Sequence, residues 1–199
     1  MSIKYQFNKT SLQQLEKQLK VRVRALPTIK NKESALRMEV KKAKNEVKRL
    51  DELLEEKIAF YENMVALWGE FNTKLVRVAD VNMSVRKIAG VKTPVLDGVD
   101  FTIEPFSLFS SPHWYPEGIE LVKQLAGVGI EREFYLQKMY LLEHARKKTT
   151  QKVNLFEKVQ IPGYEDAIRK IKRFMEDEEN LSKSAQKIVK SRQEEEVDL

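Results

Sequence analysis

The amino-acid sequence predicts a mainly α-helical protein. An N-terminal and a C-terminal helix form a long antiparallel two-helix coiled coil, with a central insert of a β-hairpin and a short helix. Three observations carry this prediction: an apolar seven-residue repeat covers residues 12–68, helical periodicity returns from residue 130, and between them the apolar spacing shortens to about two residues. Charged residues make up 33% of the chain, which suits long solvated helices better than a globule.

The N-terminal repeat is the most regular feature of the chain. Fourteen of its seventeen seam positions are apolar, and the residues between them are mostly charged. A repeat of 3.5 residues per turn keeps one face of a helix against a partner, so it is typical of a coiled coil. Such a helix would be roughly 85 Å long and would need a second helix to bury its seam. The polar seam positions Arg22, Glu33 and Lys57 are expected to fix the register or to mark where the seam leaves its partner.

Local signals indicate the ends of this helix and one irregularity within it. Asn8, Thr10 and Ser11 are suitable N-cap residues just before the first seam leucine. Pro27 removes a backbone hydrogen bond, but the apolar repeat keeps its phase across it. We therefore expect a kink in one continuous helix that extends to Trp68.

The insert, residues 69–129, begins with a predicted β-hairpin. Apolar residues alternate with polar ones from Val76 onward, and strand character returns from Val95 to Ile103. Between these stretches, Gly90–Pro94 is a turn or bulge signal. A hairpin of this size is marginal in water, so it must pack on the helices or on another protein.

A loop with three prolines follows the hairpin. Its aromatic residues form either a local hydrophobic pad under the helices, which we favour, or an exposed contact surface. These residues are Phe106, Phe109, Trp114 and Tyr115. A short amphipathic helix is expected from Gly118, with Gly127 and Gly129 interrupting it.

The C-terminal helix is predicted over residues 130–199. Its apolar phase slips near Pro162–Gly163, where we expect a kink or a local change of supercoil. Pairing it with the N-terminal helix gives an antiparallel hairpin of helices, with the two termini at one end of a rod. In this interpretation residues 1–68, 69–129 and 130–199 form one structural unit.

The sequence offers no catalytic chemistry, cofactor site or metal site. There is no cysteine and no phosphate-binding glycine motif. The two histidines, His113 and His144, lack metal-ligand spacing. The acidic run 176–179 points to different faces of a helix, so a solvated surface is favoured over a cation site. We also find no signal peptide and no apolar run of roughly 20 residues, so a cytoplasmic protein is expected.

Several segments, in order, resemble the D subunit of the vacuolar/archaeal-type (V-type/A-type) rotary ATPases. They are Asn8–Leu12, Lys30–Leu36, Val85–Pro94, Thr149–Glu157 and Val159–Ile168. The resemblance spans nearly the whole chain, and the most specific match is near the C-terminus, Thr149–Glu157 followed by Val159–Ile168. Pro27 departs from the unbroken helix that the family usually keeps.

This resemblance implies a non-catalytic central shaft. Such a shaft couples ATP hydrolysis or synthesis in the A/B catalytic hexamer to rotation of the membrane ring and to proton or sodium transport. Its joined termini enter the hexamer, and its other end binds the F subunit and the C/d socket of the rotor. The resemblance thus implies a cytoplasmic protein, peripheral to the membrane, with no cofactor, no nucleic acid and no membrane insertion.

Two groups of residues are candidate contacts with these partners. The basic group would contact the hexamer, although ordinary solvated helix charge explains each member about as well: Lys20, Arg22, Arg24, Arg37, Arg169, Lys172 and Arg173. The hairpin group would contact the lower stalk or modulate turnover, although packing on the chain's own helices is favoured: Val81, Met83, Val85 and Ile88.

Two other classes of function remain open from the sequence. A basic helical module could bind nucleic acid, and its binding would then depend steeply on salt. The chain lacks a basic stripe with interleaved aromatic residues, which disfavours this alternative. A coiled-coil scaffold would instead pair the N-terminal seam between two copies of the chain.

Overall fold

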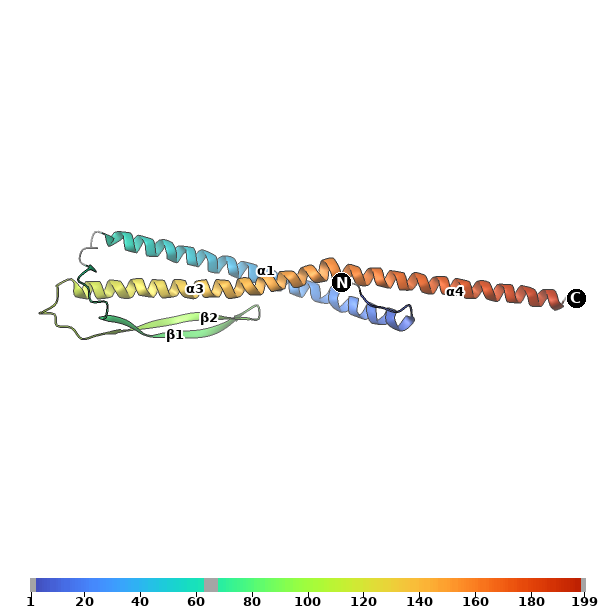
Figure 1. The fold of residues 1–199 in the computed structure, drawn as a ribbon, viewed down its shortest axis with the longest axis horizontal. Coiled ribbons are helices and arrows are strands. Elements are labelled where there is room, and N and C mark those ends of the chain that lie inside the picture. The colour runs from blue at the N-terminus through green and yellow to red at the C-terminus, as the bar shows by residue number, and fades with distance from the viewer. Residues whose placement is uncertain (1–2, 63–67, 198–199) are drawn as a thin grey trace. The chain divides into compact units, whose positions relative to one another are not determined.

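The computed structural model describes residues 3–62 and 68–197. Its elements are, in order, α1 (Lys9–Phe60), β1 (Val76–Ile88), β2 (Val91–Ile103), α3 (Tyr115–Leu155), the π-helical turn η2 (Phe156–Gln160) and α4 (Ile161–Val197) (Figure 1). The predicted fold class is confirmed: an N-terminal helix, a long C-terminal helix and a central antiparallel hairpin.

The chain forms two compact units. The first unit contains Met1–Asn31 and Thr149–Leu199, and the second contains Lys32–Lys148. Both long helices contribute residues to each unit, because α1 and α3 run through the boundaries. The predicted three-segment organisation stays a prediction.

In the first unit, α1 packs antiparallel to η2 and α4. Along α1 the partners run backwards through the C-terminal helix: Glu16 contacts Lys172, Gln18 contacts Tyr164, Arg22 contacts Gln160 and Lys30 contacts Glu157. The apolar core of this unit contains Leu15 with Tyr164, Ala167, Ile168 and Ile171. The N-terminal arm adds Ile3 and Tyr5 to the same core.

Helix α1 begins where the sequence predicted and ends earlier. Asn8 is the N-cap, because its Oδ1 accepts a hydrogen bond of 2.7 Å from the backbone N–H of Ser11. The helix runs unbroken through Pro27, as expected, and ends at Phe60. The predicted extension to Trp68 is wrong, and Met64 lies outside the described residues. The indole of Trp68 packs instead within the insert, 5.3 Å from the ring of Phe71.

The β-hairpin is confirmed, with one correction. Ala89 and Gly90 both have positive φ, 49° and 87°, which makes them the two central residues of a tight hairpin turn. The reversal therefore precedes Val91, and Pro94 lies within β2 opposite Val85 rather than in the turn. Two register shifts mark irregularities: Ala79 is the extra residue of β1 between Val78 and Asp80, and Asp97 is the extra residue of β2 opposite the Asn82–Met83 step.

An aromatic cluster forms the core of the insert. Phe71, Leu75 and Ile119 are buried, with Trp114 and Tyr115 packed against them. The favoured local pad is therefore present for most of the loop aromatics, because Phe106 also joins this cluster. Phe109 does not: it is fully exposed, next to exposed Leu108.

Helix α3 corrects the prediction for the second half of the insert. It runs unbroken from Tyr115 to Leu155, so the expected short helix is simply its first part. Gly127 and Gly129 do not interrupt it, because a glycine costs a helix interior only about 1 kcal/mol and the surrounding residues are partly buried. Within the second unit α3 packs antiparallel to α1, with Arg132 Nε donating to Asp51 Oδ1 at 2.6 Å.

The phase slip expected near Pro162–Gly163 takes the form of η2. Seam residues Thr149 and Phe156 are seven residues apart, and so are Tyr164 and Ile171, whereas Phe156 and Tyr164 are eight apart. A π-helical turn holds one more residue than an α-helical turn, so η2 absorbs the extra residue and returns the seam to the same face.

Candidate partner-binding surfaces

A polar layer crosses the helix pair of the first unit beside η2. Arg22 donates from Nε to Gln160 Oε1 at 2.8 Å and from a terminal nitrogen to the carbonyl oxygen of Gln18 at 3.1 Å. Its guanidinium lies 4.6 Å from the ring centre of Tyr164, whose hydroxyl donates to Gln18 Oε1 at 2.7 Å. These partners hold Arg22 between the paired helices of its own chain, and its predicted contact with the hexamer stays a prediction.

The other predicted basic residues are divided between the units. Four of them are exposed in the first unit and form no ion pair with the side chains described in residues 3–62 and 68–193: Lys20, Arg24, Arg169 and Arg173. Lys172 pairs with Glu16 at 3.0 Å in the same unit. Arg37 lies in the second unit and pairs with Glu33, one turn earlier on α1.

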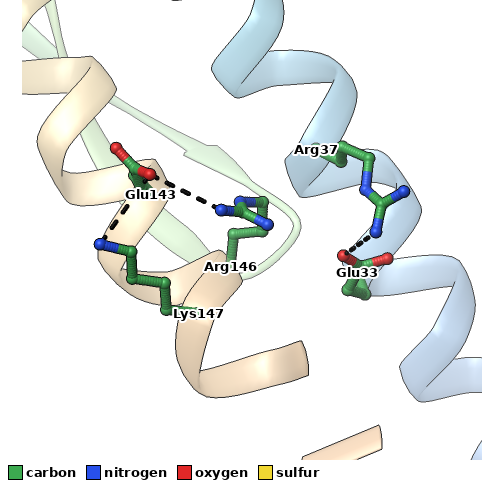
Figure 2. A network of polar contacts seen from close by, with 5 residues as sticks. All are labelled: Glu33, Arg37, Glu143, Arg146 and Lys147. Carbon is green, nitrogen blue, oxygen red and sulfur yellow. Dashed lines mark hydrogen bonds and ion pairs between the residues drawn. The ribbon is translucent and has the colours of Figure 1, made fainter. Parts of the chain in front are cut away.

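Figure 2 shows how charges near Arg37 are satisfied. Arg37 points along α1 toward Glu33, with 2.9 Å between the paired atoms. On α3, Glu143 lies 3.6 Å from Arg146 and 3.9 Å from Lys147. These pairs form within single helices, and partly exposed pairs of this kind contribute little to stability. Arg37 is thus held by its own helix, and its predicted contact with the hexamer stays a prediction.

The distal part of α4, residues 176–193, carries an apolar seam that no other described part of the chain covers. The buried heptad positions Tyr164 and Ile171 continue as Leu181 and Ile188, at steps of ten and seven residues that keep the same face. Every described side chain from Glu176 to Gln193 is exposed, including Leu181 at 72% and Ile188 at 56%. The seam therefore extends well beyond the part that α1 and the N-terminal arm cover.

The four predicted hairpin residues fall into two classes. Val81 and Ile88 are half-buried, whereas Met83 and Val85 are exposed at 63% and 67%. Met83 lies opposite Leu96, and Val85 lies opposite Pro94, so these four side chains form two neighbouring cross-strand pairs. A groove between β2 and α3, lined by Phe134 and Tyr135, lies in the same unit.

The loop tip is a surface that the sequence only partly indicates. Phe109 is one of the loop aromatics whose role the sequence leaves open, and Leu108 is not among the predicted contacts. Both are exposed beside a short turn in which the N–H of Ser110 donates to the carbonyl oxygen of Ser107. Adjacent apolar residues in a proline-rich loop are the signal that could have identified this surface.

The residues that the structure describes contain no group of three or more His, Asp or Glu side chains placed to hold a metal ion. His113 and His144 are both exposed. Among residues 3–62 and 68–197, no helix has the length and apolar character needed to cross a bilayer.

The paired helices, the π-helical turn and the hairpin can be compared with known families. A family model that describes the D subunit of ATP synthase matches residues 11–191. The chain belongs to the family of ATP synthase D subunits. The match includes both long helices and the whole insert, so the family resemblance seen in the sequence is confirmed.

Curated relatives support this membership over nearly the full length. The V-type ATP synthase D subunit of Borreliella burgdorferi is 31% identical over 194 residues, which cover 94% of each chain. The proteins of the same name from Chlamydia pneumoniae and Chlamydia trachomatis are 28% and 27% identical. These alignments cover 89% and 96% of the present chain and 87% and 97% of the relatives.

Proposed function

We propose that this chain is the central rotor shaft of a V/A-type ATPase or ATP synthase. It couples ATP hydrolysis or synthesis in the A/B catalytic hexamer to rotation of the membrane ring and to proton or sodium transport. The chain itself has no active site in this proposal; it acts in the cytoplasm, at the membrane periphery, by transmitting torque.

The bare seam of distal α4 is the observation that carries this proposal. A lone helix with a solvated apolar stripe gains little from intrinsic propensity, because most helical stability in proteins comes from packing. Leu181 and Ile188 therefore favour a partner that surrounds the end of the chain. The central cavity of a hexamer provides such a surface.

The basic residues of the first unit extend this contact. Lys20, Arg24, Arg169 and Arg173 are exposed and are assigned to the hexamer interface. Arg22 is assigned to the internal polar layer instead, because three groups of its own chain already hold it. On binding the hexamer, Lys172 would leave Glu16, or share it with a group of the hexamer, and Arg37 would do the same with Glu33.

The hairpin and the loop tip of the second unit are assigned to the lower stalk. The F subunit and the C/d socket of the membrane rotor are their proposed partners. Exposed Met83 and Val85 on the hairpin, together with Leu108 and Phe109 on the loop tip, supply the apolar anchors such interfaces require.

The asymmetry of the shaft lets its rotation change the state of each catalytic interface in turn. The two paired helices of the first unit differ in sequence, so a partner with three equivalent catalytic interfaces meets a different face at each one. Differential contacts then bias the three interfaces toward different nucleotide states, which is a population shift driven by rotation.

A co-precipitation experiment tests the proposal. Tagged chain is mixed separately with purified A/B hexamer, F subunit and C/d subunit, and circular dichroism verifies its helices. The proposal expects capture of the hexamer and of at least one lower-stalk protein. Failure to capture any of them with the helices intact would overturn it.

The alternative, a homodimeric scaffold, would need the apolar seam of α1 to be free for a second copy of the chain. In the first unit the seam of α1 is already occupied by the chain's own C-terminal helix, since Leu15 packs with Ile168 and Ile171. Light scattering separates the two: the shaft is expected to be a monomer in isolation, and a stable homodimer with no affinity for the hexamer would favour the scaffold.

A further inference from the structure

The tip of the β-hairpin carries an unbalanced cluster of positive charge. Lys87 and Lys92 are directly opposite each other across the two strands, on either side of the Ala89–Gly90 turn. Arg86 is adjacent in sequence and lies opposite buried Thr93, on the other face of the hairpin. All three cationic side chains are exposed, and none forms an ion pair or a side-chain hydrogen bond within the described part of the chain.

The body of the same hairpin is acidic instead, with Asp80, Asp97 and Asp100 against the cation Arg77. Asn82 donates to Asp100 at 2.8 Å, and Ser84 donates to Asp97 at 3.2 Å, each across the strands. At the open end, Arg77 pairs with Glu104 at 2.9 Å. Like charges thus face each other in both parts, Asp80 opposite Asp100 in the body and Lys87 opposite Lys92 at the tip, and such pairs destabilise the pairing. In the body, Asp97 and Asp100 accept cross-strand hydrogen bonds, whereas the tip cations have no such partner within the described part of the chain.

An apolar strip adjoins the cationic tip. Met83 and Val85 are among the most exposed apolar side chains of the chain and lie on β1 just before Arg86. A surface that combines exposed apolar side chains with unpaired cations suits an acidic protein surface, because the apolar part supplies area and the charges supply orientation.

Other anionic partners fit this tip less well. Recognition of anionic lipid typically uses clusters of 4–8 basic residues, and the tip has three. Single-stranded nucleic acid is held by aromatic side chains that stack on bases, and residues 83–96 include no aromatic residue.

We propose that the hairpin tip docks on a carboxylate-rich surface of a neighbouring protein, with Lys87 and Lys92 facing its acidic groups and with Met83 and Val85, on the same face of the hairpin, covering an adjacent apolar patch. This inference rests on the proposed function, because the neighbour is a component of the same rotary assembly. It adds the chemistry of the contact: a salt-dependent ionic rim beside a small apolar anchor.

The variant Lys87→Glu separates docking from folding. It places a glutamate opposite Lys92, so the cross-strand pair becomes attractive and the hairpin is expected to melt no earlier than in the wild type. Docking on an acidic surface would nevertheless weaken. A purely structural role for Lys87 would move stability and binding in the same direction.

Binding of the full chain is measured against the A/B hexamer, the F subunit and the C/d subunit at low and at high ionic strength. Lys87→Glu is expected to lower the affinity for one of these by about tenfold at low salt, and the loss should shrink as salt screens the charges. Lys87→Arg should bind like the wild type. Lys41→Glu, the same charge change at an exposed site on α1, is the matched control and should also bind like the wild type.

The possible outcomes discriminate clearly. If the wild type binds these proteins and Lys87→Glu binds them equally well, the docking inference is overturned and the shaft proposal stands. If the wild type binds none of them, both are overturned. A loss that appears only with vesicles containing anionic lipid, or with single-stranded RNA, also overturns the acidic-protein assignment.

Discussion

Two apolar side chains on the same seam of α4 should respond in opposite ways to truncation. Ile171 is fully buried against α1, whereas Leu181 is exposed and one and a half heptads further on. Ile171→Ala removes a core side chain and should lower the free energy of unfolding of the isolated chain by about 2–5 kcal/mol. Leu181→Ala should change it by less than about 0.5 kcal/mol, because the side chain contacts little in the isolated chain.

The order reverses when binding is measured. If the hexamer covers the distal seam, burying Leu181 contributes about 1.5–3 kcal/mol to the complex. Its truncation should then raise the dissociation constant by about 10- to 150-fold. Ile171→Ala should leave the dissociation constant nearly unchanged under conditions in which the chain remains folded.

Urea titration followed by circular dichroism gives the free energy of unfolding, and titration of labelled chain with A/B hexamer gives the dissociation constant. Ser184→Ala, an exposed change one turn after Leu181 on α4, is the matched control and should leave both quantities unchanged. The reasoning is refuted if Leu181→Ala destabilises the isolated chain by as much as Ile171→Ala, or if it binds the hexamer as tightly as the wild type.

Three further predictions concern local features. Deleting Lys158 removes the extra residue of η2 and should convert this turn to α-helix with little loss of thermal stability. Deleting Lys152 from the regular helix α3 should instead shift the apolar seam and lower the melting temperature strongly. If the two deletions lower the melting temperature equally, η2 does not correct the phase of the seam. Gly118→Ala should lower the free energy of unfolding by about 1–3 kcal/mol, because the new Cβ would lie 2.7 Å from a ring carbon of Trp114. Gly127→Ala, where the new Cβ would meet no other atom, should raise it by about 0.5–1 kcal/mol; urea titration measures both changes. The hydrogen bond and positive charge of Lys183, one turn later, lower the pKa of Glu179. The pair therefore stabilises the distal helix α4 above the ordinary glutamate pKa of roughly 4.3, and this stabilisation is lost as the pH falls through the lowered pKa. Amide hydrogen exchange in distal α4 should accelerate at low pH, and Glu179→Gln should remove that part of the acceleration.

The periodic features were predictable because they depend on repeated local choices. Leucine and isoleucine at seven-residue spacing, and alternation in the hairpin, are consistent over many residues, so one contrary residue such as Pro27 did not break the pattern. The slip in the C-terminal repeat was visible as well. Its π-helical form was not, because spacing alone does not distinguish a kink from an inserted residue.

The predictions that failed were single-residue signals overridden by tertiary packing. Trp68 fits the apolar repeat, yet its side chain packs in the aromatic cluster of the insert. Gly127 and Gly129 lower helix propensity, but α3 packs along its length and continues through both. Pro94 resembles a turn residue, whereas two positive φ angles fix the reversal at Ala89–Gly90.

The candidate surfaces were predictable in kind but not in detail. Basic residues on the terminal helices were found by residue type, but only the structure shows that Arg22 is held by Gln18, Gln160 and Tyr164. Within the hairpin, the sequence could not separate exposed Met83 from half-buried Val81, because the irregular register decides how each side chain is covered. Sequence pattern identifies which residues are apolar, but burial depends on the neighbour that each one meets.

Rotation itself is the most direct test of the shaft. The chain has no cysteine, so Ser107→Cys on the exposed loop gives a unique attachment point for a bead. With the A/B hexamer fixed to a surface, we predict ATP-dependent rotation of the bead in one direction, with three dwells per turn. A chain that binds the hexamer but stays still during ATP hydrolysis, or that does not bind, would contradict the account.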